Sequence, residues 1–320
     1  MAVYTEISNE DLSNFVRKYD IGDALSAEGI VEGVENSNYL LKTTVGSFIL
    51  TLYEKRVNPE DLPFFLYLKE HLAAKGLACP SPLRALNGEV LHSLSDRPAA
   101  IVTFLKGESP GRINLDHCAQ LGAALAEMHL AGSDFTMTRS NALSVGAWGP
   151  LLENSLRCTE DLRAGLAVEL QTELMALERN WPVDLPKGTI HSDVFPDNVL
   201  FKHGKLSGIL DFYFACTDLF AYDLAVCMNA WCFESDGSLN VNKVQSLLTS
   251  YRYIRPLSGP EIEALPILAR GAAFRFLLTR MFDWFFTPVG AFVNKKDPLE
   301  YLEKLKFHQQ IKGPSDYGIN

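Results

Sequence analysis

Cysteines are few in this sequence, and their spacing excludes the common metal and redox motifs. No two of the six stand in a C-x-x-C arrangement, and four of them lie in apolar or helical runs. The six are Cys79, Cys118, Cys158, Cys216, Cys227 and Cys232. Reduced, mostly buried thiols of this kind are typical of cytoplasmic proteins, so we expect a cytoplasmic location and no disulfide framework.

Basic residues are too few for a general binder of nucleic acids. Lys and Arg together number 29 and Asp and Glu together number 39, which gives a formal net charge of -10. Affinity for nucleic acids rests largely on Lys and Arg side chains that meet phosphates. We therefore expect no nucleic-acid partner, although a local phosphate site remains open.

Long uninterrupted hydrophobic runs are also lacking. The most apolar stretch is 210–233, and Asp211, Asp218 and Asp223 interrupt it. Three carboxylates cost too much in a bilayer, so the stretch predicts a buried segment with functional acids rather than a membrane span. The first residues, MAVYTEISNEDLSNF, have neither a basic region nor an apolar core, so we expect no signal peptide and no membrane partner.

Composition and length are those of a globular protein with two domains or one large domain. The chain has 320 residues, of which 47% are hydrophobic and 21% charged. The first 105 residues are rich in strand-forming patterns, whereas the rest is mostly helical in pattern. The boundary lies at 104–107, which is too short for a flexible tether. We expect domains at 1–105 and 106–320.

Hydrophobic periodicity predicts the elements of both parts. In the first part a helix begins after Ser8, a second runs from Pro59 to Gly76, and Val45-Gly46 forms a tight turn between two strands. The predicted strands are 30–34, 38–43, 47–53, 89–93 and 99–105. The second part should contain helices at 115–130 and 155–179, short strands within 190–214, and helices from about 219 onward.

The densest polar cluster in an apolar setting is the run HSDVFPDNVLF at 191–201. Asp193 and Asn198 stand five residues apart, and Asp211 follows thirteen residues later, after two short strand patterns. Phosphoryl transfer needs a carboxylate that orients the attacking hydroxyl and accepts its proton, and oxygen ligands that hold magnesium against the triphosphate. Asp193 fits the first role, and Asn198 and Asp211 fit the second. The alternative interpretation is that His191, Asp193 and Asn198 are ordinary turn residues near Pro196.

These residues carry a resemblance to a known family. The run 191–201 and the run GILDFYFAC at 208–216 resemble the aminoglycoside phosphotransferase and choline kinase superfamily, whose members are related to protein kinases. The resemblance covers nearly the whole chain, through the runs 33–39, 76–83, 101–107, 121–129 and 222–225. Within the superfamily, the runs 191–201, 211–216, 229–232 and 275–280, together with Asp283-Trp284, resemble type II homoserine kinases.

The resemblance implies an α+β fold of the two-lobed protein-kinase-like kind. Its N-lobe would be an antiparallel sheet with one major helix, and its C-lobe would be mostly helical and carry the catalytic loop. ATP would lie between the lobes with its base against 104–106, and Mg2+ would bind Asn198 and Asp211. The implied reaction is ATP-dependent phosphorylation of L-homoserine, a small-molecule substrate, to O-phospho-L-homoserine in threonine biosynthesis, with Asp193 and Asn198 as the catalytic residues. The oligomeric state stays open.

The nucleotide site departs from the kinase pattern. The strand position that usually carries Lys or Arg is Thr51, and the helix position of its Glu partner falls near Phe65. The absence of both the cation and its Glu partner is self-consistent, because a buried charge that has lost its partner destabilises the folded protein. Lys42, Lys55 and Arg56 are the nearby cations, and no G-x-G-x-x-G is present. The implied nucleotide-binding residues are Gly33, Asn36, Thr51, Phe104, Leu105 and Lys106.

Homoserine is a zwitterion, so its site should offer an Arg for the carboxylate and an acid for the ammonium. The substrate-binding residues that the resemblance indicates are Arg275, Arg280, Asp283 and Trp231. Two alternatives stay open: Arg280 and Asp283 stand at i,i+3 and could form an ordinary helix pair, and Trp231 could belong to the core. His191 is expected to be structural. Asp223 is expected to cap a helix and to tie the catalytic loop in place.

Two other functions remain open at this point. One is a kinase for another small alcohol or amine, of the choline or aminoglycoside type. An aminoglycoside is polycationic, and the Arg-bearing segment 275–280 argues against a strongly acidic site. The other is a kinase-like binding module without catalysis. Intact Asp193, Asn198 and Asp211 argue against the module, whereas Thr51 keeps it open.

Overall fold

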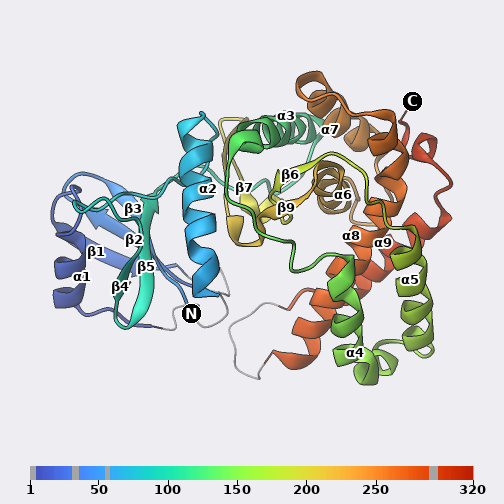
Figure 1. Cartoon of the computed structure of the whole chain (residues 1–320), viewed down its shortest axis with the longest axis horizontal. Coiled ribbons are helices and arrows are strands. Elements are labelled where there is room, and N and C mark those ends of the chain that lie inside the picture. The colour runs from blue at the N-terminus through green and yellow to red at the C-terminus, as the bar shows by residue number, and fades with distance from the viewer. Residues whose placement is uncertain (1–4, 31–35, 55–57, 288–294, 320) are drawn as a thin grey trace. The chain divides into compact units, whose positions relative to one another are not determined.

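The structure is a computed structural model that describes residues 5–30, 36–54, 58–287 and 295–319. The chain divides into two compact units (Figure 1). The N-terminal unit comprises Met1–Gly107 together with the short segment Ser207–Leu210, and the C-terminal unit comprises Glu108–Leu206 and Asp211–Asn320. No sequence pattern indicates that 207–210 packs with the first unit.

The N-terminal unit is built on a five-stranded antiparallel sheet in the order β1-β2-β3-β5-β4. Its strands are β1 (Ala24–Gly29), β2 (Ser37–Thr43), β3 (Ser47–Leu52), β4 (His92–Leu94) and β5 (Arg97–Thr103). The first strand lies before the predicted 30–34, and residues 31–35 fall outside the described residues. Its sequence, ALSAEG, has weak strand propensity, so its pairing with β2 decides its conformation.

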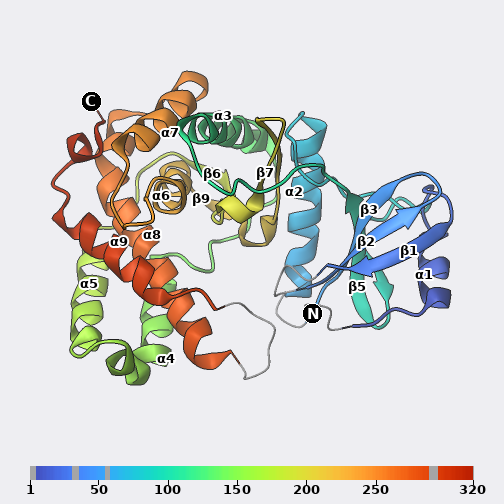
Figure 2. The same ribbon diagram turned by 180° about the vertical axis from the view of Figure 1, so that it is seen from behind.

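Two helices flank this sheet, α1 (Asn9–Val16) and α2 (Leu62–Ala74), and they lie on opposite sides of it (Figures 1 and 2). The predicted start of the first helix is confirmed, because the Ser8 hydroxyl accepts a hydrogen bond from the Asp11 amide at 3.1 Å. Leu12, Phe15 and Val16 of α1 belong to the same buried cluster as inward residues of the sheet such as Leu41 and Leu50.

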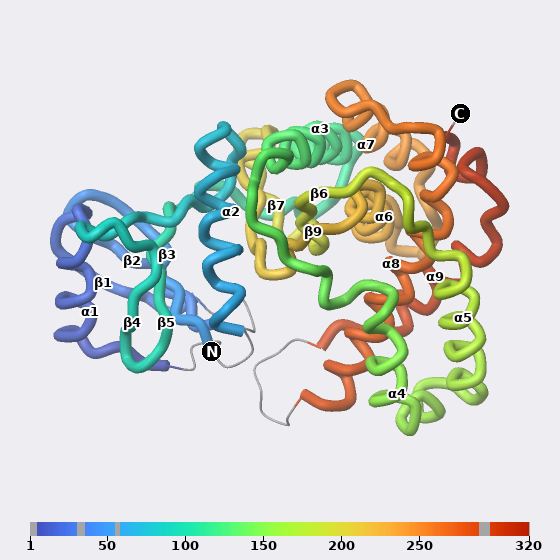
Figure 3. Tube along the Cα trace, viewed as in Figure 1, coloured from blue at the N-terminus to red at the C-terminus, as the bar shows by residue number. Residues whose placement is uncertain are grey.

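The C-terminal unit is mostly helical. Its helices are α3 (Leu115–Ala131), α4 (Val145–Leu162), α5 (Leu166–Asn180), α6 (Phe220–Trp231), α7 (Val241–Ile254), α8 (Gly259–Phe286) and α9 (Pro298–Gln310). Two small two-stranded sheets pair β6 (Lys187–Ile190) with β9 (Cys216–Leu219), and β7 (Val199–Lys202) with β8 (Lys205–Ile209). In the trace of Figure 3, β6 and β9 run side by side next to α6.

The single helix predicted at 155–179 is wrong, because the structure has two helices there, α4 and α5. The chain is extended at Arg163, with φ of -164° and ψ of 133°, and Gly165 has a left-handed φ of 75°. Glycine adopts positive φ without the steric penalty that a Cβ brings. The apolar periodicity continues across this break, so the periodicity alone does not reveal it.

Helix α8 is the long central helix of the unit, with 28 residues. A capping box fixes its start, since the Ser258 hydroxyl and the Glu261 carboxylate each accept a hydrogen bond from the other's backbone amide. At Gly271 a Cβ would come within 2.2 Å of the Trp181 ring, so this glycine lets the ring pack directly on the helix. In the described parts of the chain, no helix is both long and apolar enough to cross a bilayer.

Candidate active site

The run 191–198 forms a loop that leaves β6 and turns back through a short 3-10 helix at Pro196–Asn198. A buried carboxylate in the first turn of α6 holds the start of this loop. Asp223 Oδ2 accepts the His191 amide at 2.8 Å, and Oδ1 accepts the Ser192 amide at 2.7 Å. Two buried backbone donors are therefore satisfied by one side chain. Asp223 does not cap α6 as the sequence suggested, because the helix begins at Phe220 and the Asp223 side chain bonds to the loop.

The same carboxylate also contacts His129 of α3. His129 Nε2 lies 3.0 Å from Asp223 Oδ2, and His129 Nδ1 lies 2.7 Å from the Tyr251 hydroxyl. Burial acts to raise the pKa of Asp223, but the hydrogen bond and charge of His129 outweigh it and hold the pKa below its usual value. Asp223 therefore joins three segments of the C-terminal unit and stays ionised.

Asp193 and Asn198 are brought together by the turn between them. Asn198 Nδ2 donates to the Asp193 carbonyl at 2.8 Å and to Asp193 Oδ2 at 3.2 Å. The Phe195 amide donates to the same carbonyl at 2.8 Å. Because the amide nitrogen of Asn198 makes both contacts, its amide oxygen is the atom left for a cation. The spacing of five residues thus produces a carboxylate and an amide at one place.

The electrostatics of Asp193 are those of a partly buried acid. Burial raises the pKa of Asp193 to about 7. The charge of Arg275 opposes this rise, and the charge of Asp211 adds to it. A cation bound beside Asn198 and Asp211 would lower the pKa of Asp193.

Asp211 follows β8 and precedes a one-turn 3-10 helix at Phe212–Phe214. The apolar strand before it suggested a buried carboxylate, but the structure shows Asp211 as an exposed residue. Its backbone is left-handed, with φ of 59° and ψ of 69°, a conformation that costs energy in a residue with a Cβ. The Phe212 ring packs on His191 with ring centres 4.6 Å apart, which ties this turn to the loop.

The donor set suits magnesium in the company of phosphate. Among the described residues, no group of three or more His, Cys, Asp and Glu side chains could hold a metal ion by itself. Mg2+ is commonly held by one or two carboxylates together with water and substrate phosphate oxygens. Asn198 and Asp211 fit that pattern, since the nucleotide would complete the ligand set.

Arg275 and Trp231, which the sequence indicated for the substrate, contact the loop backbone instead. Arg275 of α8 is 1% exposed, and its Nη1 donates to the Ser192 carbonyl and hydroxyl. Trp231 at the end of α6 is fully buried, and its indole donates to the Val194 carbonyl at 2.7 Å. Both side chains therefore flank Asp193 from inside the unit.

The comparisons with known proteins show the family of the chain. The model of the phosphotransferase enzyme family matches residues 26–257, which is most of the chain. The chain belongs to the phosphotransferase enzyme family. This confirms the resemblance stated above at the level of the superfamily.

Individual relatives and a solved structure agree with this result. Two curated relatives called homoserine kinase, from Paramagnetospirillum magneticum and Rhodospirillum rubrum, are each 58% identical over 100% of this chain and 100% of their own. They confirm the resemblance to homoserine kinases. A solved amicoumacin kinase in complex with AMP-PNP and Ca2+ is 14% identical with a TM-score of 0.70, and the match covers 95% of this chain and 92% of that one. This confirms the α+β kinase-like fold.

The remaining predicted substrate residues of this phosphotransferase lie at the far end of α8. Arg280 Nη1 contacts Glu300 Oε2 at 2.6 Å and the Asp297 carbonyl at 3.1 Å. The guanidinium stacks on the Tyr301 ring at 4.4 Å. Arg280 thus forms an ion pair with Glu300, while the Asp283 carbonyl accepts the Thr287 amide at the helix end.

The predicted nucleotide residues are distributed over the N-terminal unit. Gly33, Lys55 and Arg56 fall outside the described residues. Asn36 is buried, and its amide oxygen accepts the Glu54 amide at 3.2 Å. Thr51 is also buried and donates to the Asn38 side chain at 2.8 Å across β2 and β3.

The segment after β5 and the nearby cations complete the predicted nucleotide set. Phe104 and Lys106 are exposed and Leu105 is partly buried. Lys42 pairs with Glu28 at 2.9 Å on the exposed surface of β1 and β2. Lys69 of α2, which the sequence reasoning did not single out, is a buried cation at 5% exposure. It stands inside an apolar helix pattern, which is the signal that would have drawn attention to it.

Lys296 is a further residue near the loop that the sequence reasoning missed. Its Nζ lies 3.0 Å from Asp197 Oδ2 and 5.2 Å from the centre of the Phe195 ring. The basic pair Lys295-Lys296 is a sequence signal for it, but no spacing rule connects that pair to 191–198.

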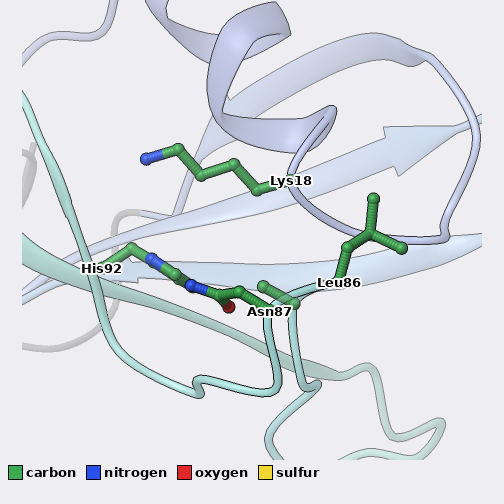
Figure 4. A pocket seen from close by; sticks show the side chains of 5 residues that line it. Lys18, Leu86, Asn87 and His92 are labelled. Carbon is green, nitrogen blue, oxygen red and sulfur yellow. The ribbon is translucent and has the colours of Figure 1, made fainter.

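A pocket of about 380 Å³ lies in the N-terminal unit. Lys18, Ala85, Leu86, Asn87 and His92 line it (Figure 4). None of them is a predicted nucleotide, metal or catalytic residue. The pocket therefore contributes nothing to the assignment of the phosphotransferase site.

Replacing Asp223 by asparagine is expected to destabilise this phosphotransferase. The carboxylate now accepts three hydrogen bonds, and the asparagine side chain would turn an N–H group toward at least one of these three donors. Removing one partner of a buried charge network costs about 3–5 kcal/mol of stability. For a unit of this size the melting temperature should fall by roughly 10 °C. Calorimetry measures the fall. Asp197→Asn is the matched control, because that carboxylate is 62% exposed, and a similar fall there would contradict the role of Asp223.

Proposed function

We propose that this chain transfers the γ-phosphoryl group of ATP to the hydroxyl of L-homoserine, which gives O-phospho-L-homoserine for threonine biosynthesis. The observation that carries the proposal is the 58% identity to curated homoserine kinases over the whole of both chains. The loop with Asp193 and Asn198, followed by Asp211, supplies the chemistry that this reaction needs.

Asp193 is the proposed catalytic carboxylate. It accepts a hydrogen bond from the acceptor hydroxyl and orients its oxygen toward the γ-phosphorus. As the new P–O bond forms, the bond to the ADP oxygen breaks, and the hydroxyl proton passes to the Asp193 carboxylate. Asn198 holds Asp193 in place through its amide nitrogen.

Asn198 and Asp211 are the proposed ligands of Mg2+. The ion would neutralise charge on the phosphate oxygens when bound with ATP. The amide oxygen of Asn198 and the exposed carboxylate of Asp211 are the atoms that would meet it. Gly33, Asn36, Thr51, Phe104, Leu105 and Lys106 are the proposed nucleotide-binding residues.

Arg280 is the proposed partner of the homoserine carboxylate. It shares Glu300 with Lys304, whose Nζ lies 2.6 Å from Glu300 Oε1. Two cations on one carboxylate leave one net positive charge, so the cluster can accept a second carboxylate. Asp283 is the proposed partner of the ammonium group of homoserine.

The six cysteines are free, which supports a cytoplasmic location.

Turnover across a panel of small alcohols tests the acceptor. Homoserine should be used more efficiently than 4-hydroxybutyrate, which lacks the ammonium, and than 3-aminopropanol, which lacks the carboxylate. Losing one charge-assisted pair costs about 2–5 kcal/mol, which is roughly 30-fold or more in kcat/KM. A coupled assay of ADP release measures each alcohol at saturating ATP.

Choline and kanamycin are the controls that separate the competing functions. Faster turnover of either one than of homoserine would replace the homoserine assignment by a choline-type or aminoglycoside-type kinase. No ADP release with any alcohol would favour a binding module without catalysis.

Arg280→Ala should raise the KM for homoserine and leave the KM for ATP nearly unchanged. Equal changes in both KM values would show that Arg280 does not belong to the acceptor site.

A further inference from the structure

The burial of Arg275 is hard to explain by packing alone. Its side chain is 1% exposed in the middle of α8, and the ion pairs among the described residues include none between Arg275 and a carboxylate. A buried charge without such a partner is expensive, and an apolar side chain would fill the same volume without that cost. The hydrogen-bond acceptors of Nη1 are both on Ser192: the carbonyl oxygen, and the hydroxyl at 3.0 Å.

Aromatic rings cover part of the guanidinium and keep it directed at the loop. Its central carbon lies 4.3 Å from the centre of the Phe276 ring and 5.6 Å from that of Phe214. These distances are within the range of cation–π contacts. The Nε atom of Arg275 is buried with no hydrogen-bond partner among the described residues, and both hydrogen bonds of Nη1 go to Ser192.

Ser192 needs to be held, because its backbone is left-handed with a φ of 66°. A serine in this conformation is strained and persists only where its surroundings fix it. Asp223 accepts the amide of Ser192, and Arg275 donates to its carbonyl. Since the next residue is Asp193, both ends of Ser192 are fixed immediately before the catalytic carboxylate.

We propose that Arg275 is a positioning residue, which fixes the Ser192 carbonyl and thereby sets the direction of the Asp193 carboxylate during phosphoryl transfer. The inference rests on the proposed function, in which Asp193 meets the acceptor hydroxyl. It gives Arg275 a role different from substrate binding: the guanidinium donates to the loop and acts on catalysis through the backbone, in addition to the effect of its charge on the pKa of Asp193.

Conservative substitution is the first test. Arg275→Lys keeps the charge but loses the planar fork that reaches both acceptors of Ser192. We expect kcat to fall about 10-fold to 100-fold, because a small misplacement of a catalytic group has effects of that size. The KM values for ATP and for homoserine should stay within about 3-fold, because Arg275 contacts neither ligand in this proposal.

Arg270→Lys is the matched control. Arg270 lies five residues earlier in the same helix and makes a two-point contact with Glu173, which is 3% exposed. Its replacement should lower the melting temperature but leave kcat within about 2-fold, because Glu173 lies in α5 and not in the loop. A merely structural role for Arg275 would make the two variants alike: a fall in melting temperature with kcat preserved.

Chemical rescue separates positioning from general stability. In Arg275→Ala, added methylguanidinium should restore part of the lost kcat, whereas it should restore none in Asp193→Asn. If Arg275→Ala does not fold, Ser192→Ala tests the hydroxyl part of the contact, since it keeps the carbonyl that accepts from Arg275. That variant should lower kcat several-fold, and its effect combined with Arg275→Lys should be smaller than the product of the two, because both remove the hydrogen bond between Arg275 and the Ser192 hydroxyl.

The proposal fails if folded Arg275→Lys retains wild-type kcat, or if the Ser192 and Arg275 effects multiply independently. It also fails if KM for homoserine rises more than 10-fold while kcat is kept, which would return Arg275 to substrate binding. The wild-type protein distinguishes this failure from failure of the proposed function. If it phosphorylates another alcohol and not homoserine, the acceptor is wrong, and the same kcat comparison is made with that alcohol.

Discussion

Asp193→Asn is expected to lower kcat by about 10²- to 10⁴-fold, the loss usual for a group that accepts a proton in the transition state. The substitution keeps the size of the side chain, and the amide oxygen of the new residue can still accept from Asn198 Nδ2, as Asp193 Oδ2 now does at 3.2 Å. The fold and the nucleotide site should therefore be preserved. A coupled ADP-release assay measures kcat, and calorimetric titration measures ATP binding, which should be nearly unchanged.

Asp197→Asn is the control for that experiment. Asp197 belongs to the same turn, but its carboxylate is 62% exposed and pairs with Lys296 at 3.0 Å. Its kcat should stay within about 2-fold of wild type, since an exposed ion pair contributes little. The proposed role of Asp193 would be abandoned if Asp193→Asn kept more than about a tenth of wild-type kcat.

Asp211→Ala should remove most of the magnesium-dependent affinity for ATP. Loss of a carboxylate that meets a cation costs about 2–5 kcal/mol, which is roughly 30-fold or more in Kd. Calorimetric titration with ATP, in the presence of Mg2+ and again with the metal chelated, isolates the magnesium-dependent part. That part should be small in the variant and large in the wild-type protein.

The backbone at Asp211 calls for a second variant at the same position. Its φ of 59° is left-handed, and alanine tolerates that conformation less well than asparagine does. Asp211→Asn keeps the local turn and removes only the charge, so it should lose MgATP affinity without a fall in melting temperature. Unchanged affinity in both variants would move the metal site to other residues.

Local features of the fold were predictable because they depend on neighbours in the chain. The cap of α1 by Ser8 joins residues three positions apart, and the contact between Asp193 and Asn198 joins residues five positions apart. The break between α4 and α5 is local as well, but it was missed. Glycine at position 165 permits a left-handed φ without requiring it, and the apolar period continues on both sides.

The exposure of Asp211 shows where a pattern misleads. Its run of apolar neighbours predicts burial, yet Asp211 is exposed at the left-handed turn between β8 and the following 3-10 helix. Apolar patterns report which face of an element packs, and they lose that meaning where an element ends.

The sequence by itself determined the β-rich and helical parts and the run of residues suited to phosphoryl transfer. Only the tertiary structure decided the partners of the buried polar side chains. Arg275 and Ser192 are 83 positions apart, Trp231 and Val194 are 37, and His129 and Asp223 are 94. Hydrophobic periodicity indicates that such residues are buried, but the partner depends on which helices pack side by side, and that choice depends on the shapes of many side chains at once.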